Sequence, residues 1–296
     1  MTLAFDSDFE YTDILGWSVS RYNMFQTCKR QYFYHYYGKY DEEHKYNKIK
    51  TLKDLTSVPL MKGKIVHEVI EKLFNRLKIT EKEINKKDFF KYTRQKCIKY
   101  ISNSTFSEVY YGDRDKIHPE EIYNKVTPCL KNFLGSKRFK WIKNKAIKYK
   151  NDWIIEPPNF GETRIEDIKA YTKFDFLTPV EDKIYIIDWK SGQPDENKDR
   201  KQLMGYTTWA CYHLDKSKDE ITAILSYLKP DYSETIISME DFDFKSFFKQ
   251  VKKETYEMRD YCKNDQENIP KSKEVFMKTS NEFLCEYCNF RDLCSK

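Results

Sequence analysis

The sequence predicts an α/β protein in which helices flank a central β-sheet. Apolar residues recur at helical spacing between residues 61 and 77. From Trp153 onward the sequence changes to short apolar runs whose order is a β-hairpin, a helix and two further strands. We expect a single domain over residues 1–296, because a chain of this length can bury one large core.

Composition narrows the class of protein. Charged residues make up 34% and aromatic residues 16% of the chain, which excludes a disordered or fibrous protein. The net charge of +6 permits a nucleic-acid partner without requiring one. No apolar run reaches the ~18 residues of a membrane span, and the first residues, MTLAFDSDFE, carry acids unlike a signal peptide. We therefore expect an intracellular, cytoplasmic protein without a membrane contact.

The first predicted element is a helix over residues 17–38, WSVSRYNMFQTCKRQYFYHYYG. Ser18 or Ser20 is a suitable N-cap, Gly38 is a suitable stop, and the aromatic residues between them can pack one helix. Cys28 falls in the middle of this helix, where a buried core thiol is the alternative to a metal ligand.

The second is the periodic helix over residues 61–77, MKGKIVHEVIEKLFNRL. Its apolar residues fall within one half of the helical wheel with His67 at the edge, so the imidazole can face a cleft beside the core. A histidine simply packed at the helix boundary is the alternative. The segment lacks the second histidine of a zinc-protease helix and the full pattern of a phosphate-binding loop, so neither function is predicted.

Residues 81–150 are predicted to form helices that break near Gly112 and Pro119 and bend at Pro128. Seven of the fourteen residues from Lys137 to Lys150 are basic and none is acidic, and aromatic residues lie among them. Such mixing suits a nucleic-acid track, in which lysines contact phosphates and rings stack on bases. The basic residues do not share one helical face, so a solvated surface is the alternative.

The strands carry the candidate chemistry. After a short strand over 153–156, residues 168–177 and 184–190 are predicted to form an antiparallel hairpin. Alternation along the second arm puts Asp188 and Lys190 on one face, and Asp175 can approach Asp188 from the first arm. Two neighbouring carboxylates repel unless a cation or proton lies between them, which favours a metal site over an ordinary surface ion pair. A metal beside a lysine can catalyse phosphodiester hydrolysis.

A helix over 200–214 follows the hairpin. It carries Gln202 and Tyr206 four residues apart, so both could hydrogen-bond one backbone phosphate, unless they belong to an ordinary helix surface. Two strands and an amphipathic helix come next, over residues 221–228, 235–239 and 241–262.

The chain ends with the cysteine-rich segment CEYCNFRDLC. Cys285, Cys288 and Cys294 can hold one metal centre, but a tetrahedral set needs a fourth thiolate. The spacing allows zinc or an iron-sulfur cluster. The candidates for the fourth ligand are Cys28, Cys97, Cys129, Cys211 and Cys262.

The chain resembles the RecB-like branch of the PD-(D/E)XK nucleases in five motifs, which occur in order along nearly its whole length: SVSRYNMFQTCKRQYFY, GKIVH, KFD, DWKSG and QLMGY. Its terminal cysteines resemble those of the iron-sulfur members, which include the AddB nuclease domain and the CRISPR-associated RecB-like exonucleases. The resemblance implies a restriction-endonuclease-like core, a mixed central sheet flanked by helices. It also implies a helical insertion over residues 80–150, closer to the AddB type.

The resemblance assigns roles to individual residues. It implies that Mg²⁺ or Mn²⁺ is held by His67, Asp175, Asp188 and the backbone carbonyl of Trp189. Asp175, Asp188 and Lys190 would be the catalytic residues. Gln202 and Tyr206 would form a QxxxY pair that contacts DNA or supports the site.

The resemblance also implies a 4Fe-4S cluster. Its ligands would be Cys28, Cys285, Cys288 and Cys294, and it would join segments 17–38 and 270–296 as a structural staple. Thr172 and Lys29 stand where relatives often have glycine and proline. Neither position is a metal ligand, so neither argues for an inactive enzyme.

The expected function is a metal-dependent DNA nuclease, an exonuclease on single-stranded ends, in DNA repair, recombination or CRISPR-type DNA processing. The expected partners are DNA and a helicase or CRISPR integrase. The main alternative is a nuclease-inactive iron-sulfur subunit that binds DNA within a helicase-nuclease or integration complex. A zinc-stapled binding module is a third hypothesis.

Overall fold

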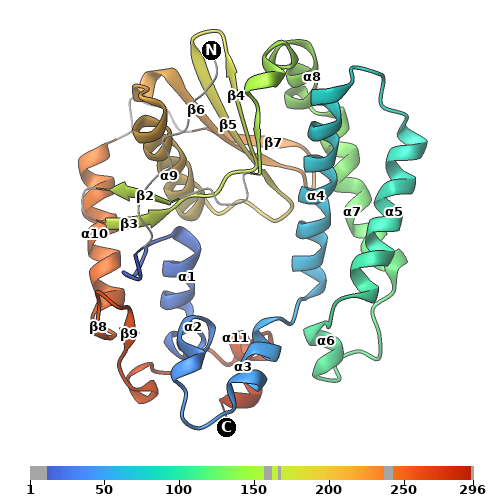
Figure 1. Ribbon diagram of the computed structural model, residues 1–296. Helices are drawn as coiled ribbons and strands as arrows, with labels where there is room; N and C mark the ends of the chain where they lie inside the picture. The colour runs from blue at the N-terminus through green and yellow to red at the C-terminus, as the bar shows by residue number, and fades with distance from the viewer. Residues whose placement is uncertain (1–11, 157–161, 166–167, 237–242, 295–296) are drawn as a thin grey trace.

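The computed structural model describes residues 12–156, 162–165, 168–236 and 243–294. It is built on a mixed five-stranded sheet, which lies in the upper part of the view in Figure 1. The strand order is β1-β4-β5-β6-β7. β5 and β6 are parallel, and the other neighbouring pairs are antiparallel. The strands are β1 (Ile154–Ile155), β4 (Phe176–Val180), β5 (Lys183–Lys190), β6 (Ile221–Tyr227) and β7 (Ser233–Ile236). The predicted α/β fold class is confirmed.

Two apolar clusters lie on opposite faces of this sheet. Successive side chains of β5 alternate between them, so that Ile184 and Ile186 belong to one cluster while Ile187 and Trp189 belong to the other. Fully burying one such aliphatic side chain stabilises the fold by about 1.5–3 kcal/mol relative to exposure. β5 is therefore held from both sides.

The first cluster includes the N-terminal helices. The prediction of a single helix over residues 17–38 is wrong. The structure has α1 (Val19–Thr27) and α2 (Lys29–Tyr37) instead, followed by η1 (Gly38–Tyr40) and α3 (Tyr46–Lys53). Cys28 separates α1 from α2 because its backbone is extended, with φ −160° and ψ 113°. Its Sγ accepts a hydrogen bond from the N–H of Gln31 at 3.5 Å, so Cys28 caps α2 instead of continuing α1.

The second cluster is built from the long helix α4 (Val58–Ile79) and the helices after it. Ser57 caps α4 and Pro59 lies in its first turn. Further helices pack outside α4 (Figure 1): α5 (Lys86–Ser102), α6 (Ser107–Tyr110), α7 (Pro119–Gly135), α8 (Lys137–Asn144) and η2 (Ala146–Asp152). Pro119 begins α7, as the predicted break requires, whereas Pro128 lies inside it.

The predicted hairpin is present, but its first arm is two strands. β3 (Ile168–Tyr171) pairs with β2 (Glu162–Ile165) in a separate small sheet, and β4 pairs with β5. Trp17 bonds to β3 as well, because its N–H donates to Lys169 and its carbonyl accepts from Tyr171. The chain changes partners between the two strands, at residues 172–175. Asp175 therefore lies just before β4 and not within a continuous strand.

The C-terminal third supplies the remaining helices and strands. It comprises α9 (Glu196–Leu214), η3 (Lys218–Glu220), α10 (Phe244–Arg259), β8 (Cys262–Asn264), β9 (Ile269–Pro270), η5 (Lys273–Val275), α11 (Glu282–Glu286) and η6 (Arg291–Leu293). Parts of the predicted strand and helix, residues 237–239 and 241–242, lie outside the described residues. Among the helices that the structure describes, none combines the length and apolar character of a membrane span.

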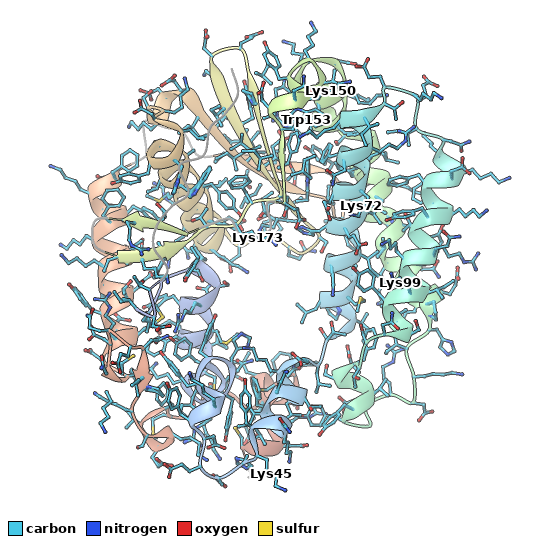
Figure 2. All side chains as sticks on the ribbon, viewed as in Figure 1. Lys45, Lys72, Lys99, Lys150, Trp153 and Lys173 are labelled. Carbon is cyan, nitrogen blue, oxygen red and sulfur yellow. The ribbon has the colours of Figure 1, made fainter. Side chains whose placement is uncertain are left out.

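The C-terminal segment contacts both halves of the molecule. On one side, Tyr34 of α2 donates a hydrogen bond to the carbonyl of Leu293 at 3.1 Å. On the other side, Tyr111 donates to the carbonyl of Asn289 at 2.6 Å, and Arg291 contacts both oxygens of Asp113 at 3.0 and 3.1 Å. In the view of Figure 2, the drawn side chains leave the middle of the molecule open between α1 and α4.

Candidate active site

The candidate site begins at the end of β5, where Asp188 and Lys190 share a face as predicted. Lys190 Nζ lies 2.6 Å from Asp188 Oδ2. Asp188 is only 4% exposed, whereas the Lys190 side chain is 24% exposed. Asp188 Oδ2 is buried and accepts no hydrogen bond from the described residues, so the contact is a charge pair whose orientation does not suit a hydrogen bond.

Asp175 reaches the same place from the segment before β4. Its Oδ2 accepts a hydrogen bond of 2.7 Å from the backbone N–H of Trp189, which lies between Asp188 and Lys190. Burial and the neighbouring charge of Asp188 raise the pKa of Asp175. The expected approach of the two carboxylates is therefore present, although Asp175 does not belong to a strand.

His67 faces this site from the middle of α4. Its Nδ1 lies 3.0 Å from Asp175 Oδ1. Burial opposes protonation of the imidazole, but Asp175, Glu156 and Asp188 together outweigh it and raise the pKa of His67 well above its usual value. His67 is therefore part of a polar cluster and not merely packed at the edge of the helix.

Glu156 belongs to the same cluster, and the sequence analysis did not select it. Its Oε1 lies 3.7 Å from His67 Nδ1, and its pKa is lowered chiefly by its interaction with the imidazole of His67. Its backbone N–H donates to the carbonyl of Asp175 at 2.9 Å. Its φ of 38° is in the left-handed region, which turns the chain just after β1. The available signal was an acid at the end of a short strand, directly before a proline.

Tyr206 approaches Asp188 from α9. Its hydroxyl donates a hydrogen bond of 2.6 Å to Asp188 Oδ1, and Gln202 Nε2 donates to the Tyr206 hydroxyl at 2.5 Å. Tyr206 is 1% exposed, so the alternative of an ordinary helix surface does not apply to it. Burial and the charge of Asp188 raise the pKa of Tyr206 well above its usual value, which keeps the hydroxyl a donor. This geometry favours support of the site over direct contact with DNA.

A second contact attaches α9 to the sheet, and the sequence analysis missed it too. Tyr227, at the end of β6, donates a hydrogen bond to Asp199, which also accepts from the N–H of Asp195 at 3.0 Å. Asp199 is 5% exposed. Tyr227 lies directly beside Lys190 in the register of the sheet. Asp199 precedes Gln202 and Tyr206 by three and seven residues, so all three lie along one side of α9.

The donor atoms suit a hard divalent cation. His67, Glu156 and Asp175 each offer a ligand atom, and these atoms lie within 4.8 Å of one another. Asp188 adds a buried oxygen without a hydrogen bond. Carboxylate oxygens with one imidazole form a ligand set that Mg²⁺ or Mn²⁺ accepts. The predicted ligand at Trp189 is a backbone group of the same strand end, between Asp188 and Lys190.

Comparison with known proteins identifies the family. The family model described as the PD-(D/E)XK nuclease superfamily matches residues 16–295. The chain belongs to the PD-(D/E)XK nuclease superfamily. Asp188, Trp189 and Lys190 fit the (D/E)XK part of this name, and Asp175 fits its first acid, with Phe174 in place of proline.

Other comparisons add little to this PD-(D/E)XK assignment. A search of solved structures lists the crystal structure of SSO0001, at 15% identity and a TM-score of 0.30, covering 63% of this chain and 77% of that one. No curated protein matches.

Three of the predicted cluster ligands of this PD-(D/E)XK protein, Cys28, Cys285 and Cys294, interact electrostatically with the fourth, Cys288. Burial raises the pKa of Cys288 to about 11, and Cys294, Cys28 and Cys285 add to the shift in that order. The other cysteines are elsewhere: Cys97 and Cys129 are fully buried in the second apolar cluster, Cys211 lies on α9 and Cys262 contacts Tyr37. Of the five candidates for the fourth thiolate, Cys28 is thus the one found beside the C-terminal three.

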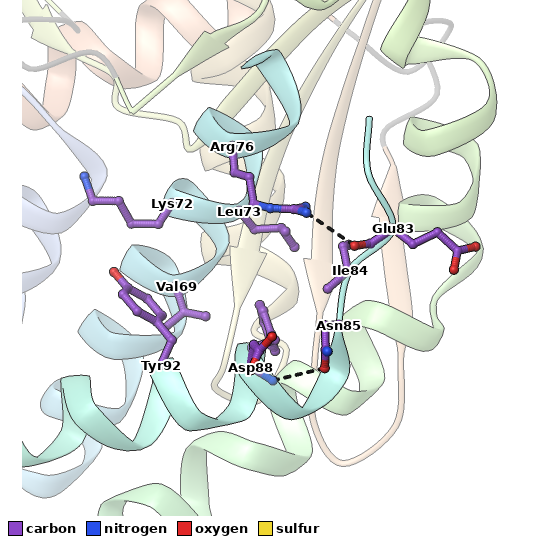
Figure 3. A pocket seen from close by; sticks show the side chains of 10 residues that line it. Val69, Lys72, Leu73, Arg76, Glu83, Ile84, Asn85, Asp88 and Tyr92 are labelled. Carbon is purple, nitrogen blue, oxygen red and sulfur yellow. Dashed lines mark hydrogen bonds between the residues drawn. The ribbon is translucent and has the colours of Figure 1, made fainter. Parts of the chain in front are cut away.

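A cavity of about 300 Å³ between α4 and α5 is separate from this site (Figure 3). It is lined by residues such as Val69, Arg76 and Tyr92 and includes none of the candidate catalytic residues. Nη2 of Arg76 donates hydrogen bonds to the carbonyls of Lys82 and Glu83, at 3.1 and 3.3 Å.

Lys173, unlike this cavity, is close to the candidate site. Its Nζ lies 3.6 Å from Glu156 Oε2, and the residue lies at the edge of the open region in Figure 2.

Proposed function

We propose that this PD-(D/E)XK nuclease is a deoxyribonuclease that requires Mg²⁺ or Mn²⁺ and digests single-stranded DNA ends. The observation that carries the proposal is the meeting of Asp175, Asp188 and Lys190 with His67 and Glu156, from four separate parts of the chain. Stability alone does not account for such a cluster, because buried like charges oppose folding.

Each residue would have a distinct task. Asp175 and Asp188, with His67, Glu156 and the carbonyl of Trp189, would hold the cation. When bound, the cation polarises the scissile phosphate and lowers the pKa of a water molecule. Lys190 would stabilise the negative charge that develops on the phosphate. The hydroxyl of Tyr206 would keep Asp188 oriented, with Gln202 behind it.

The cysteines support a second part of the proposal. Cys28, Cys285, Cys288 and Cys294 would hold a 4Fe-4S cluster that staples the N-terminal helices to the C-terminal segment. The cluster would have a structural role, since hydrolysis of a phosphodiester needs no electron transfer. The work of such an enzyme would lie in DNA repair, recombination or CRISPR-type DNA processing, beside a helicase or an integrase.

The test is cleavage of DNA by the anaerobically purified protein. Single-stranded and duplex substrates labelled at the 5′ or 3′ end would be incubated with Mg²⁺, Mn²⁺ or a chelator. We expect metal-dependent products from single strands, and their loss in Lys190→Ala and Asp188→Asn. Lys183→Ala is the matched control, because Lys183 is an exposed lysine at the other end of β5.

Two outcomes would contradict the proposal. Cleavage at the wild-type rate by both variants would show that Lys190 and Asp188 are not catalytic residues. No cleavage by a folded, cluster-loaded protein that still binds DNA would favour the inactive DNA-binding subunit. A colourless protein that contains zinc would contradict the cluster but leave the nuclease proposal standing.

A further inference from the structure

We propose that exposed lysines on α8 and η2 form a second binding surface, which holds the phosphate backbone of a nucleic acid away from the catalytic residues. The surface, called here the α8 patch, consists of Lys140, Lys143, Lys145 and Lys148. All four side chains are exposed. The choice of DNA as the polyanion rests on the proposed function, whereas the existence of an anion-binding surface does not.

The other basic residues of this segment have structural partners. Arg138 contacts both carboxylate oxygens of Glu234, at 2.8 and 3.0 Å, and Lys137 lies 3.6 Å from the same carboxylate. Lys150 pairs with Glu81 at 2.8 Å. These three cations attach α8 and η2 to β7 and to the segment after α4. The two carboxylates therefore offset two of these three positive charges.

The α8 patch is not compensated. None of its four lysines has an ion pair with a carboxylate of the described residues. Removing the charge of all four would lower the net charge of the protein from +6 to about +2. Lys140 and Lys143 are three residues apart on α8, and Lys145 and Lys148 are three apart at η2, so each pair lies one turn apart. Like charges at this spacing repel, and a polyanion removes the repulsion.

The aromatic residues of the segment pack mainly against the protein. Phe139 is 3% exposed, and the ring of Trp141 packs on Tyr185 of β5 with 4.7 Å between ring centroids. Arg138 lies over the same Trp141 ring, 5.0 Å from its centroid. Trp141 and Tyr149 are half-buried against the second apolar cluster, so neither ring is fully presented to a base. The α8 patch should therefore contact phosphates and not bases, and its binding should depend on salt and not on sequence.

The patch is rigid and is separate from the active site. Trp153 Nε1 donates to the carbonyl of Ala146 at 3.1 Å, and Lys78 of α4 donates to the carbonyl of Trp153 at 3.0 Å. Figure 2 shows Lys150 and Trp153 at this end of the molecule. Trp141 of α8 packs on Tyr185 of β5. Tyr185 precedes Asp188 by three residues, or roughly 10 Å of strand. It also points to the opposite face of the sheet.

The test measures binding without cleavage. Affinity for labelled duplex and single-stranded DNA would be titrated in chelator over a range of KCl concentrations, for the wild type and for the quadruple variant Lys140→Gln, Lys143→Gln, Lys145→Gln and Lys148→Gln. Glutamine retains the helix propensity of lysine. If all four lysines contact phosphates, the slope of log K against log[KCl] falls in magnitude by about 3.6 for duplex and about 2.8 for single strands.

A matched control separates local binding from net charge. Lys245, Lys249, Lys252 and Lys263 are equally exposed and lie on α10 and β8, at the opposite side of the molecule from α8 (Figure 1). Their fourfold replacement by glutamine removes the same charge and should leave the slope near the wild-type value. Equal losses in both variants, or no loss in either, would overturn the proposal.

Two further measurements keep the result independent of the nuclease proposal. The α8 variant should retain cleavage of short single strands, because none of its substitutions touches the candidate active site. Polyglutamate should bind the wild type and the α8 variant alike. A loss of polyglutamate binding as large as the loss of DNA binding would assign the patch to an acidic protein partner instead.

Discussion

Tyr206 supports the candidate site through one hydrogen bond. Its ring is buried and its hydroxyl donates to Asp188 Oδ1, the carboxylate oxygen that does not face Lys190. A hydrogen bond to a charged group stabilises by about 1.5–3 kcal/mol, and a buried acceptor that loses its donor keeps its full desolvation penalty. The orientation of Asp188 therefore depends on this residue.

We predict that Tyr206→Phe lowers kcat by roughly 10- to 100-fold and leaves KM for DNA nearly unchanged, because the hydroxyl acts on Asp188 and not on the substrate. Steady-state cleavage of a labelled single strand measures both constants. Tyr212→Phe is the control, since Tyr212 lies on the same helix and is 53% exposed. A rise in KM with kcat unchanged would instead make Tyr206 a DNA contact.

His35 makes the stability of the fold depend on pH. Burial lowers the pKa of His35 to about 4, and the positive charges of Lys53 and Arg21 add to the effect. The folded protein therefore binds this proton less tightly than the unfolded chain, whose histidine has a pKa near 6.5. The stability that follows from neutral His35 is present above pH 6.5 and is lost as pH falls toward 4.

We predict that the free energy of unfolding of His35→Gln falls less than that of the wild type as pH is lowered from 6.5 to about 4. The shift corresponds to at most about 3 kcal/mol, and solvent screening reduces it. Urea unfolding above pH 6.5 and again between 6.5 and 4 measures the difference. His118→Gln is the control, because His118 is exposed. Parallel pH profiles for His35→Gln and the wild type would contradict the argument.

Among the site residues, those that follow from periodicity were predictable and Glu156 was not. Alternation along β5 placed Asp188 beside Lys190, and helical spacing placed His67 at the edge of α4. Glu156 reaches His67 only because its backbone has a positive φ and because β1 pairs with β4. No local pattern encodes such a long-range pairing.

At the scale of elements, the junction of α1 and α2 differs most from the prediction. The sequence pattern of residues 17–38 is continuous, but a single extended residue, Cys28, divides it. Helical propensity changes little across Cys28, so pattern alone could not locate the break. The cause is tertiary: Arg30 of α2 donates to the carbonyls of Met277 and Phe276 through its N–H and its Nε, at 3.2 and 2.9 Å.

Substitutions at Cys28 separate its capping of α2 from its proposed role as a cluster ligand. We predict that Cys28→Ser and Cys28→Ala both lose the cluster, whereas Ser keeps the cap of α2 and Ala does not. Without the cluster, the alanine variant should then be about 1 kcal/mol less stable than the serine variant. Visible absorption and metal content measure the first effect, and urea unfolding measures the second. Full metal content in Cys28→Ser would remove Cys28 from the ligand set.

The hairpin shows a second limit of prediction from sequence. Residues 168–177 have the sequence pattern of one strand, yet β3 ends at Tyr171 and β4 begins at Phe176. β3 bonds to Trp17 and β2, and β4 bonds to β1 and β5, so distant partners determine where each strand ends. The second arm had no such competition and was predicted correctly.

At the scale of the whole molecule, the contacts of the C-terminal segment join two halves that otherwise share the sheet. Arg291 contacts both oxygens of Asp113 and lies 3.9 Å from the ring centroid of Tyr111. Asn289 donates to the carbonyl of Leu55 at 2.8 Å and accepts from Tyr111. These contacts connect the cysteine segment with the segment before α4 and with the segment after α6.

We predict that Asp113→Asn has little effect on global stability, below about 1 kcal/mol, because the pair is partly exposed. Backbone amides of residues 105–113 should nevertheless exchange hydrogen faster, since this contact holds their end of the structure. Hydrogen exchange by mass spectrometry measures the effect. Arg94→Gln is the control, because it removes an exposed ion pair with Glu120 that lies within one half. Faster exchange in both variants would show that the contact has no particular role.

The convergence of the four cysteines has a consequence for biosynthesis. Cys28 and Cys285 are far apart in the chain, and synthesis at about 5–20 residues per second separates them by roughly 13 to 50 seconds. Throughout that interval the nascent chain presents Cys28 without its partners. The proposed cluster, which would need all four thiolates, could form only after the ribosome has added Cys294. Until then Cys28 would have to stay reduced to serve as a ligand.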